Sequence, residues 1–125
     1  MVDKSRPCIF LIEDDETMIN LLVILLNLEN FITVKLEQEE TDLIISQILV
    51  TKPDLILMDI FLNKLSGLDI LKEIRSKPDL KNTKIIISSG SDMKDFCLAN
   101  GADGFILKPY MPEELIKMIH FQLEH

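Results

Sequence analysis

Short apolar segments alternate with longer helical patterns along this chain, and the alternation limits the possible folds more than any other feature. The apolar segments have the length of strands and are typical of strands that a sheet buries on both faces. Five strand–helix units in strict alternation predict an α/β fold, a doubly wound parallel sheet of five strands with helices on both faces. We expect the strands at residues 8–14, 32–36, 55–59, 84–88 and 104–108, and helices at residues 16–29, 41–51, 67–77 and 92–99 and from Pro112 onward.

Composition and charge narrow the class of protein. The 125 residues suit one domain, and 47% hydrophobic and 27% charged residues are ordinary for a globular protein. The net charge of −8 argues against direct binding to nucleic acid or to an anionic membrane surface. The apolar run at residues 19–28 is about half of the roughly 20 residues that a membrane span needs, so we expect no membrane insertion. Cys8 and Cys97 lie in no disulfide or metal pattern and indicate reduced thiols in a cytoplasmic protein.

Polar residues stand at the points where the predicted strands end. Glu13 and Asp14 end the first strand, Asp59 the third, Ser89 the fourth and Lys108 the fifth. In a sheet of this kind, ligands bind beyond the carboxyl ends of the strands, near the point where the strand order reverses. We therefore expect these side chains to meet in one crevice. Taken singly, each is most simply a helix cap or a turn residue, and only their convergence favours a site.

Three carboxylates, a hydroxyl and a lysine in one crevice predict phosphate chemistry. Carboxylates held close together repel one another, so they either take up protons or bind a cation. Oxygen ligands without His or Cys point to Mg²⁺, which takes one or two carboxylates and keeps several waters. A lysine suits a phosphoryl oxygen, and an aspartate beside both can act as a nucleophile toward phosphorus. We interpret Asp59 as a phosphoryl acceptor.

The order of these motifs resembles a known family. The acidic pair lies in "LIEDDE", Asp59 ends "LILMD", a glycine follows in "LSG", and "IIISSG" and "GADGFILKP" complete the set. Over residues 7–122 the chain resembles the receiver domain of bacterial two-component response regulators. The resemblance implies a flavodoxin-like (βα)5 fold with strand order 2-1-3-4-5. We assign residues 1–122 to the receiver domain and residues 123–125 to the remnant of an expression tag.

The resemblance implies a role for each acidic residue. Asp59 would take a phosphoryl group from the phosphohistidine of a histidine kinase or a phosphotransfer domain. Asp14, Asp59 and the backbone carbonyl of Phe61 would bind Mg²⁺, and Glu13 would hold a water on the metal. A main-chain ligand makes an aromatic residue acceptable at this position, because its side chain need not coordinate.

The resemblance also implies how phosphorylation is transmitted. Ser89 would follow the phosphoryl oxygen, Lys108 would pair with it, and Phe105 would occupy the aromatic switch position. Ser89 replaces a more frequent threonine, and Asn63 stands where proline is frequent, so we expect a less rigid loop after Asp59. The interval from Ser89 to Lys108 is short by nearly a turn, so we expect a stunted fourth helix.

The first predicted helix carries more apolar residues than one face needs. We expect one set of residues to face the core, namely Met18, Leu21, Leu22 and Leu25. This leaves Ile19, Val23 and Ile24 outside, and an exposed apolar stripe suggests a partner. The resemblance places the docking helices of a kinase or phosphotransfer domain here. The alternative is a helix partly covered by neighbouring side chains. A homodimer also stays open, without a predicted interface.

Three functions remain open from the sequence. The first is a phosphorylation-dependent signalling switch, which is no enzyme beyond accepting and losing its own phosphoryl group. The second is a Mg²⁺-dependent phosphatase of the haloacid dehalogenase type. That class needs a second aspartate two residues after the first, and this chain has Phe61 there. The third is a module that binds a partner without phosphorylation, which the complete set of site residues argues against.

Overall fold

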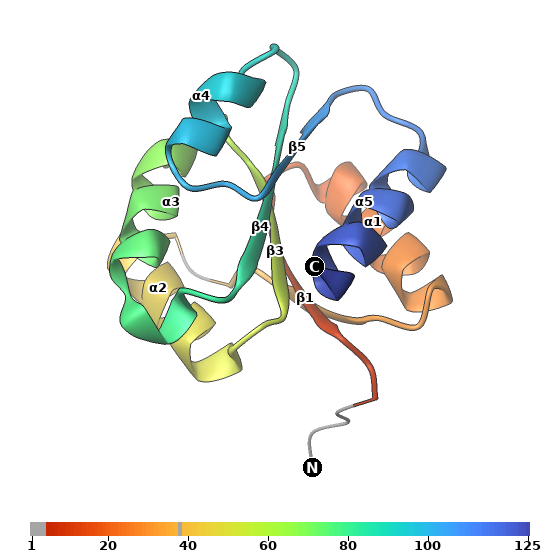
Figure 1. Cartoon of the computed structure of the whole chain (residues 1–125), viewed down its shortest axis with the longest axis horizontal. Helices are drawn as coiled ribbons and strands as arrows, with labels where there is room; N and C mark the ends of the chain where they lie inside the picture. Colours follow the sequence, from red (N-terminus) through yellow and green to blue (C-terminus); the bar gives the residue numbers. More distant parts are fainter. Residues whose placement is uncertain (1–4, 38) are drawn as a thin grey trace.

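The computed structural model of the chain describes residues 5–37 and 39–125. These residues form a five-stranded parallel sheet between two layers of helices (Figure 1). The strand order is β2-β1-β3-β4-β5, which confirms the predicted fold. The strands are β1 (Cys8–Ile12), β2 (Ile32–Lys35), β3 (Leu55–Asp59), β4 (Lys84–Ser89) and β5 (Gly104–Leu107), and the helices are α1 (Glu16–Leu28), α2 (Thr41–Thr51), α3 (Gly67–Ser76), the 3₁₀ turn η1 (Pro78–Leu80), α4 (Lys94–Ala99) and α5 (Pro112–Glu124).

The core has two halves, one on each face of the sheet. Helices α1 and α5 cover one face, and α2, α3 and α4 cover the other (Figure 1). Strand β3 contributes to both halves, because Ile56 and Met58 pack under α2 and α3 while Leu55 and Leu57 pack under α1 and α5. A strand buried on both faces needs apolar residues at every position. This requirement explains the continuous apolar run before Asp59.

The observed elements differ from the expected ones mainly at their ends. Strand β1 ends at Ile12, whose partner on β3 is Met58, so Glu13 already lies beyond the sheet. The η1 turn was not predicted, because three residues carry too little periodicity to show in the sequence. Helix α4 has only six residues, which confirms the expected stunted helix. No helix in the described part of the chain is long and apolar enough to cross a membrane.

The turn from β3 into α3 depends on a close approach of two backbone segments. A Cβ atom added to Gly67 would lie 2.5 Å from the carbonyl oxygen of Ile60, so only glycine fits there. The Gly67 N–H donates to that same carbonyl at 3.2 Å. The Ser66 hydroxyl accepts from the Asp69 N–H and caps α3. The loop after Asp59 is therefore fixed where it enters the helix.

Candidate functional site

The carboxyl edge of the sheet brings most of the predicted site residues together. Asp59 ends β3, Ser89 ends β4, and Lys108 follows β5 directly. These strands are neighbours, and the ladder pairs Asp59 with Ser88 and Ser89 with Leu107. Glu13 and Asp59 are 7% and 9% exposed, and Ser89 is fully buried. The edge thus holds two carboxylates in a nearly dry position, where an unpaired charge is costly.

Lys108 is the cation that these two carboxylates share. Its Nζ donates to Oδ2 of Asp59 at 2.7 Å and to Oε2 of Glu13 at 3.3 Å. Burial lowers the pKa of Lys108, but its hydrogen bond to Asp59 and the charge of Glu13 outweigh this effect, and the pKa is raised. For Glu13, burial is the largest effect and raises the pKa, against the opposing charge of Lys108. The lysine therefore stays charged, while burial makes ionisation of Glu13 less favourable than it is in water.

Each buried carboxylate also accepts a backbone hydrogen bond from its own loop. Oδ1 of Asp59 accepts from the Phe61 N–H at 2.9 Å, and Oε1 of Glu13 accepts from the Asp15 N–H at 3.3 Å. Lys108 contacts the second oxygen of each carboxylate, so the orientation of both the Asp59 and the Glu13 side chain is fixed. Orientation of this kind prepares Asp59 to present one oxygen to an electrophile.

Asp14 lies differently from the other two acids. It is exposed, and its Oδ2 accepts from the backbone N–H of Asn63. Among the residues that the structure describes, no three acidic, His or Cys side chains converge in a group that could hold a metal. Mg²⁺ needs only one or two carboxylates with several waters, so an all-oxygen set of Glu13, Asp14 and Asp59 still suits its chemistry. Bringing Asp14 to the metal requires its side chain to turn.

The predicted switch residues lie next to this group. The Ser89 hydroxyl accepts from the Ser91 N–H at 3.0 Å, and the Ser89 carbonyl accepts from the Lys108 N–H at 2.8 Å. The peptide bond between Lys108 and Pro109 is cis. Phe105 is 9% exposed and packs into the core half under α2 and α3. Phe61, by contrast, is 58% exposed, so its ring lies largely outside the crevice.

The expected orientation of α1 was only partly correct. Leu22, which was expected to face the core, is buried, and so is Leu26, whereas Leu21 is exposed rather than inward. Ile24 is 60% exposed, as expected. Ile19 and Val23, expected outside, are half-buried. Apolar residues surround α1 almost completely, so periodicity could not choose the buried face, and only packing against the sheet did.

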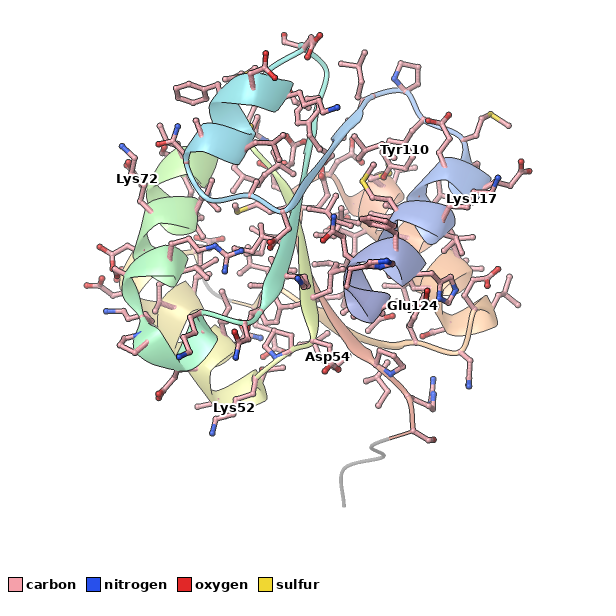
Figure 2. All side chains as sticks on the ribbon, viewed as in Figure 1. Lys52, Asp54, Lys72, Tyr110, Lys117 and Glu124 are labelled. Atoms are coloured by element: carbon pink, nitrogen blue, oxygen red, sulfur yellow. The ribbon has the colours of Figure 1, made fainter. Side chains whose placement is uncertain are left out.

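An apolar groove lies along the exposed stripe of α1, which consists of Leu21, Ile24 and Leu28. The groove measures about 550 Å³, and its opposite wall is the segment from Lys108 to Pro112. Figure 2 shows Tyr110 on this segment, beside α5. The pKa of Tyr110 is raised, mainly by burial. Sequence reasoning missed Tyr110, although its place two residues after the site lysine was a signal that could have drawn attention to it.

Comparison with known proteins identifies similar sequences over almost the whole chain. Residues 9–120 match the family model of the response regulator receiver domain. The chain is 28% identical over 124 residues to the DNA-binding response regulator MtrA of Mycolicibacterium smegmatis, covering 98% of this chain and 53% of MtrA. It is 37% identical over 117 residues to the cell cycle transcriptional regulator CtrA of Caulobacter vibrioides, covering 90% of this chain and 48% of CtrA. The chain spans about half the length of these curated relatives.

Solved structures show the same arrangement of strands and helices. The BeF3-activated N-terminal receiver domain of Klebsiella pneumoniae RstA superposes with a TM-score of 0.82 and 26% identity, covering 94% of this chain and 99% of that one. The receiver domain of the sensor histidine kinase PA1611 from Pseudomonas aeruginosa has a TM-score of 0.84 and 20% identity, covering 96% of this chain and 99% of that one. That structure has a magnesium ion coordinated in its active-site cleft.

Proposed function

We propose that this chain, which belongs to the family of response regulator receiver domains, is a signalling switch that is set by phosphorylation of Asp59. The observation that carries the proposal is the contact between Lys108 and Asp59, 2.7 Å long, at a crevice where Glu13 and Asp59 are nearly buried. A carboxylate oriented by one lysine and one backbone N–H is a suitable nucleophile for phosphoryl transfer. Members of this family typically signal rather than act on an outside substrate.

The transfer itself is a displacement at phosphorus. An Asp59 oxygen forms the new P–O bond while the P–N bond of the donor's phosphohistidine breaks. The nitrogen keeps the electron pair, and the imidazole then takes up a proton. Lys108 pairs with a phosphoryl oxygen, and the Ser89 hydroxyl donates to another. Both groups stabilise negative charge on the transferred group, which is where catalysis of this reaction acts.

Mg²⁺ is the cofactor that the donor set suits. Asp14, Asp59 and the backbone carbonyl of Phe61 would bind it, and Glu13 would hold one of its waters. When bound, the metal neutralises charge on the phosphoryl oxygens. The magnesium ion in the PA1611 receiver domain supports this assignment by its place in a domain of the same fold.

A helix of a histidine kinase or phosphotransfer domain is the partner that the apolar groove suits. Lys108 lines the groove and also contacts Asp59, so a helix lying across Ile24 brings a phosphohistidine close to the acceptor. An amphipathic helix in an apolar groove is a common mode of recognition. Such a relay is expected in the cytoplasm. A second copy of this chain in the groove is the alternative, and sedimentation would reveal it as a homodimer.

The acceptor can be tested with a small donor that needs no partner. With Mg²⁺ and acetyl phosphate, we expect intact-mass spectrometry to show one added phosphoryl group that is stable in acid and labile in base. Asp59→Asn should abolish the adduct, while Asp79→Asn, which alters an exposed acid on η1, should not. No adduct on the unaltered chain, or an undiminished adduct in Asp59→Asn, would refute the proposal.

The docking surface can be tested separately from the acceptor. Ile24→Asp places a charge in the groove and should slow phosphorylation by a phosphohistidine protein at least tenfold, yet leave the rate with acetyl phosphate unchanged. Val50→Asp is the matched control, because Val50 is 86% exposed and lies on α2, away from the groove. Equal slowing in both variants would argue against docking at α1.

A further inference from the structure

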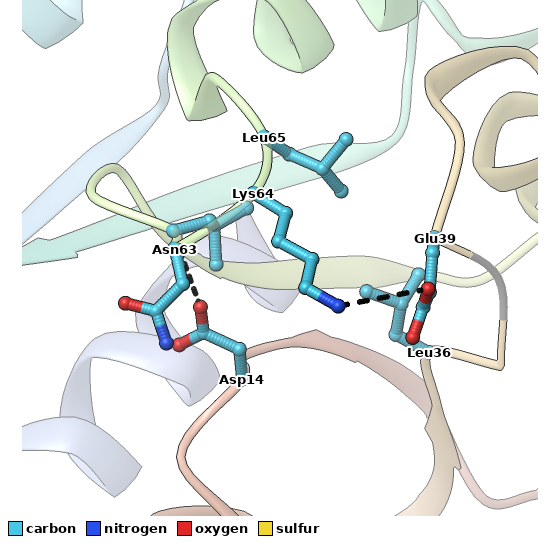
Figure 3. A pocket seen from close by; sticks show the side chains of 7 residues that line it. Asp14, Leu36, Glu39, Asn63, Lys64 and Leu65 are labelled. Carbon is cyan, nitrogen blue, oxygen red and sulfur yellow. Dashed lines mark hydrogen bonds and ion pairs between the residues drawn. The ribbon is translucent and has the colours of Figure 1, made fainter.

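The Asp14 side chain makes a contact that metal binding alone does not require. Its Oδ2 accepts a hydrogen bond of 2.5 Å from the backbone N–H of Asn63. The bond joins the loop after β1 to the loop between β3 and α3. Figure 3 shows Asp14 and Asn63 facing each other at the wall of a cavity of about 250 Å³, with Lys64 and Glu39 on its other side.

The loop between β3 and α3 is anchored at both ends. At its start, the Ile60 N–H donates to the Ser88 carbonyl at 3.1 Å, and the Phe61 N–H donates to Asp59. At its end, Ser66 pairs with Phe61 in an antiparallel bridge, and Gly67 donates to Ile60. Residues 62–65, which we term the loop tip, lie between these anchors.

Among the described residues, the hydrogen bond from Asn63 to Asp14 is the main polar contact that holds the loop tip. The other polar contact is the ion pair between Lys64 and Glu39, at 4.0 Å with side chains 76% and 81% exposed. Ion pairs this exposed contribute little to stability. Leu62 and Leu65 pack only partly against the core. A hydrogen bond to a charged acceptor is stronger than one between neutral groups.

Metal binding and this hydrogen bond require different positions of the Asp14 carboxylate. Oxygens of Glu13 and Asp59 both lie within 3.3 Å of Lys108 Nζ. Together with Asp14, these acids form no group among the described residues that could hold a metal with their side chains as they stand. To share a cation with Asp59, the Asp14 side chain must turn toward it. The anchors at residues 60–61 and 66–67 limit how far the Asn63 N–H can follow that movement.

We propose that the backbone N–H of Asn63 competes with Mg²⁺ for the Asp14 carboxylate, so that metal binding releases the loop tip. The inference rests on the proposed metal site and adds to it a residue that sets metal affinity and couples the metal to a surface loop. The competition is a property of this sequence. A proline at position 63, which is frequent in the family, has no N–H to donate.

Two substitutions at position 63 separate the amide from the side chain. Asn63→Pro removes the backbone N–H, whereas Asn63→Ala removes the side chain and keeps the N–H. By titration calorimetry with Mg²⁺ alone, we expect Asn63→Pro to bind about five- to tenfold more tightly than the unaltered chain, as loss of one charge-assisted hydrogen bond near solvent predicts. Asn63→Ala should bind as the unaltered chain does. Binding by Asn63→Pro that is equal to or weaker than that of Asn63→Ala would overturn the proposal.

A second measurement uses the unaltered chain, because proline also restricts the backbone at this position. Saturating Mg²⁺ should accelerate hydrogen exchange of the Asn63 amide, followed by NMR, at least threefold. The amide of Ile70, which donates to the Ser66 carbonyl in α3, is the control and should not change. Unchanged or slower exchange at Asn63 with Mg²⁺ bound would refute the competition while leaving the metal site standing. A chain that binds no Mg²⁺ at all would refute both.

Discussion

Two cationic side chains at opposite ends of the sheet have similar exposure but very different surroundings. At the carboxyl end, Lys108 is 22% exposed and pairs with Asp59 and Glu13. At the other end, Arg75 of α3 is 21% exposed and pairs with Asp103 at 2.6 Å. Lys108 carries one mobile point charge on a flexible stem, whereas the guanidinium of Arg75 is a rigid planar fork.

The Arg75 pair is saturated with hydrogen bonds. Beyond Asp103, the guanidinium donates to the carbonyls of Gly101 at 2.7 Å and Thr83 at 2.9 Å. Asp103 in turn accepts from the Ile85 N–H at 2.8 Å. One side chain thus joins α3, the start of β4 and the turn before β5. Its partners are mostly backbone groups that cannot leave, so this pair stabilises the fold.

The Lys108 pair holds two acids whose charges a single lysine cannot fully compensate. Both acids are potential ligands of a cation, and one of them is the proposed acceptor. Lys108 can therefore change partners, because a metal or a phosphoryl group can replace part of its contact with the two acids. The number of fixed backbone partners, rather than the exposure of the cation, distinguishes the structural Arg75 pair from the proposed functional site around Lys108.

The largest expected effect breaks the structural pair. Arg75→Met leaves Asp103 and several backbone carbonyls without their donor, so we expect the free energy of unfolding to fall by about 2 kcal/mol. Urea denaturation measures this change. Lys72→Met is the matched control, because Lys72 is an exposed residue of the same helix (Figure 2) and should change stability by less than about 0.5 kcal/mol. Equal effects would contradict the structural role of Arg75.

A smaller effect is expected when the functional pair is broken. Lys108→Met leaves Glu13 and Asp59 repelling each other, which should cost about 1 kcal/mol in the presence of a chelator. Saturating Mg²⁺ should remove most of this loss, because the cation replaces the charge of the lysine. The same addition should not rescue Arg75→Met. A loss that persists in Mg²⁺ would mean that Lys108 is a structural residue like Arg75.

The pH dependence of the free energy of unfolding tests whether ionisation of the buried Glu13 destabilises the folded state. Its folded pKa is raised, chiefly by burial. Protonated Glu13 therefore stabilises the folded state, and this stabilisation is complete below the unfolded pKa of about 4.3. It is lost as the pH rises through the pKa that Glu13 has in the folded state. In chelator, Glu13→Gln should gain stability relative to the unaltered chain between pH 4 and pH 7. Urea titrations at both pH values measure the gain, which should be absent in the control Glu113→Gln, an exposed site. A constant difference across this range would contradict the raised pKa.

The smallest expected effect concerns the lifetime of the phosphorylated state. Hydrolysis needs a water in line with the phosphorus, and position 61 lies close to its path. Phe61 cannot orient that water by hydrogen bonding, so Phe61→Asn should speed the decay of phosphorylated protein severalfold. Because the ring is 58% exposed, we expect little of the effect to come from steric shielding. Phe96 lies on α4 and lines a small apolar pocket together with Phe61, so Phe96→Asn is the control and should not change the decay rate. If neither variant decays faster, Phe61 does not limit hydrolysis.

Local patterns in the sequence predicted most of the fold and the members of the site. The run before Asp59 reads as a buried strand because both faces of β3 are covered. Asp59 and Ser89 end their strands, and Lys108 follows β5 directly. Parallel strands bring their carboxyl ends together, so Asp59 and Lys108 could be placed side by side before any coordinates. Element ends were less certain, because β1 stops where its pairing with β3 stops, and the sequence does not show that register.

Only the tertiary structure decided which way individual side chains turn. Helix α1 is apolar on nearly every side, so its spacing predicted that Leu22 faces the sheet but could not show that Leu26, rather than Leu21, does so too. Asp14 follows Glu13 directly, yet it faces Asn63 while Glu13 faces Lys108. Periodicity and motif order are properties of neighbouring residues along the chain. The partner of a side chain depends on a loop or strand that folding brings from far away, and that partner determines what the side chain does.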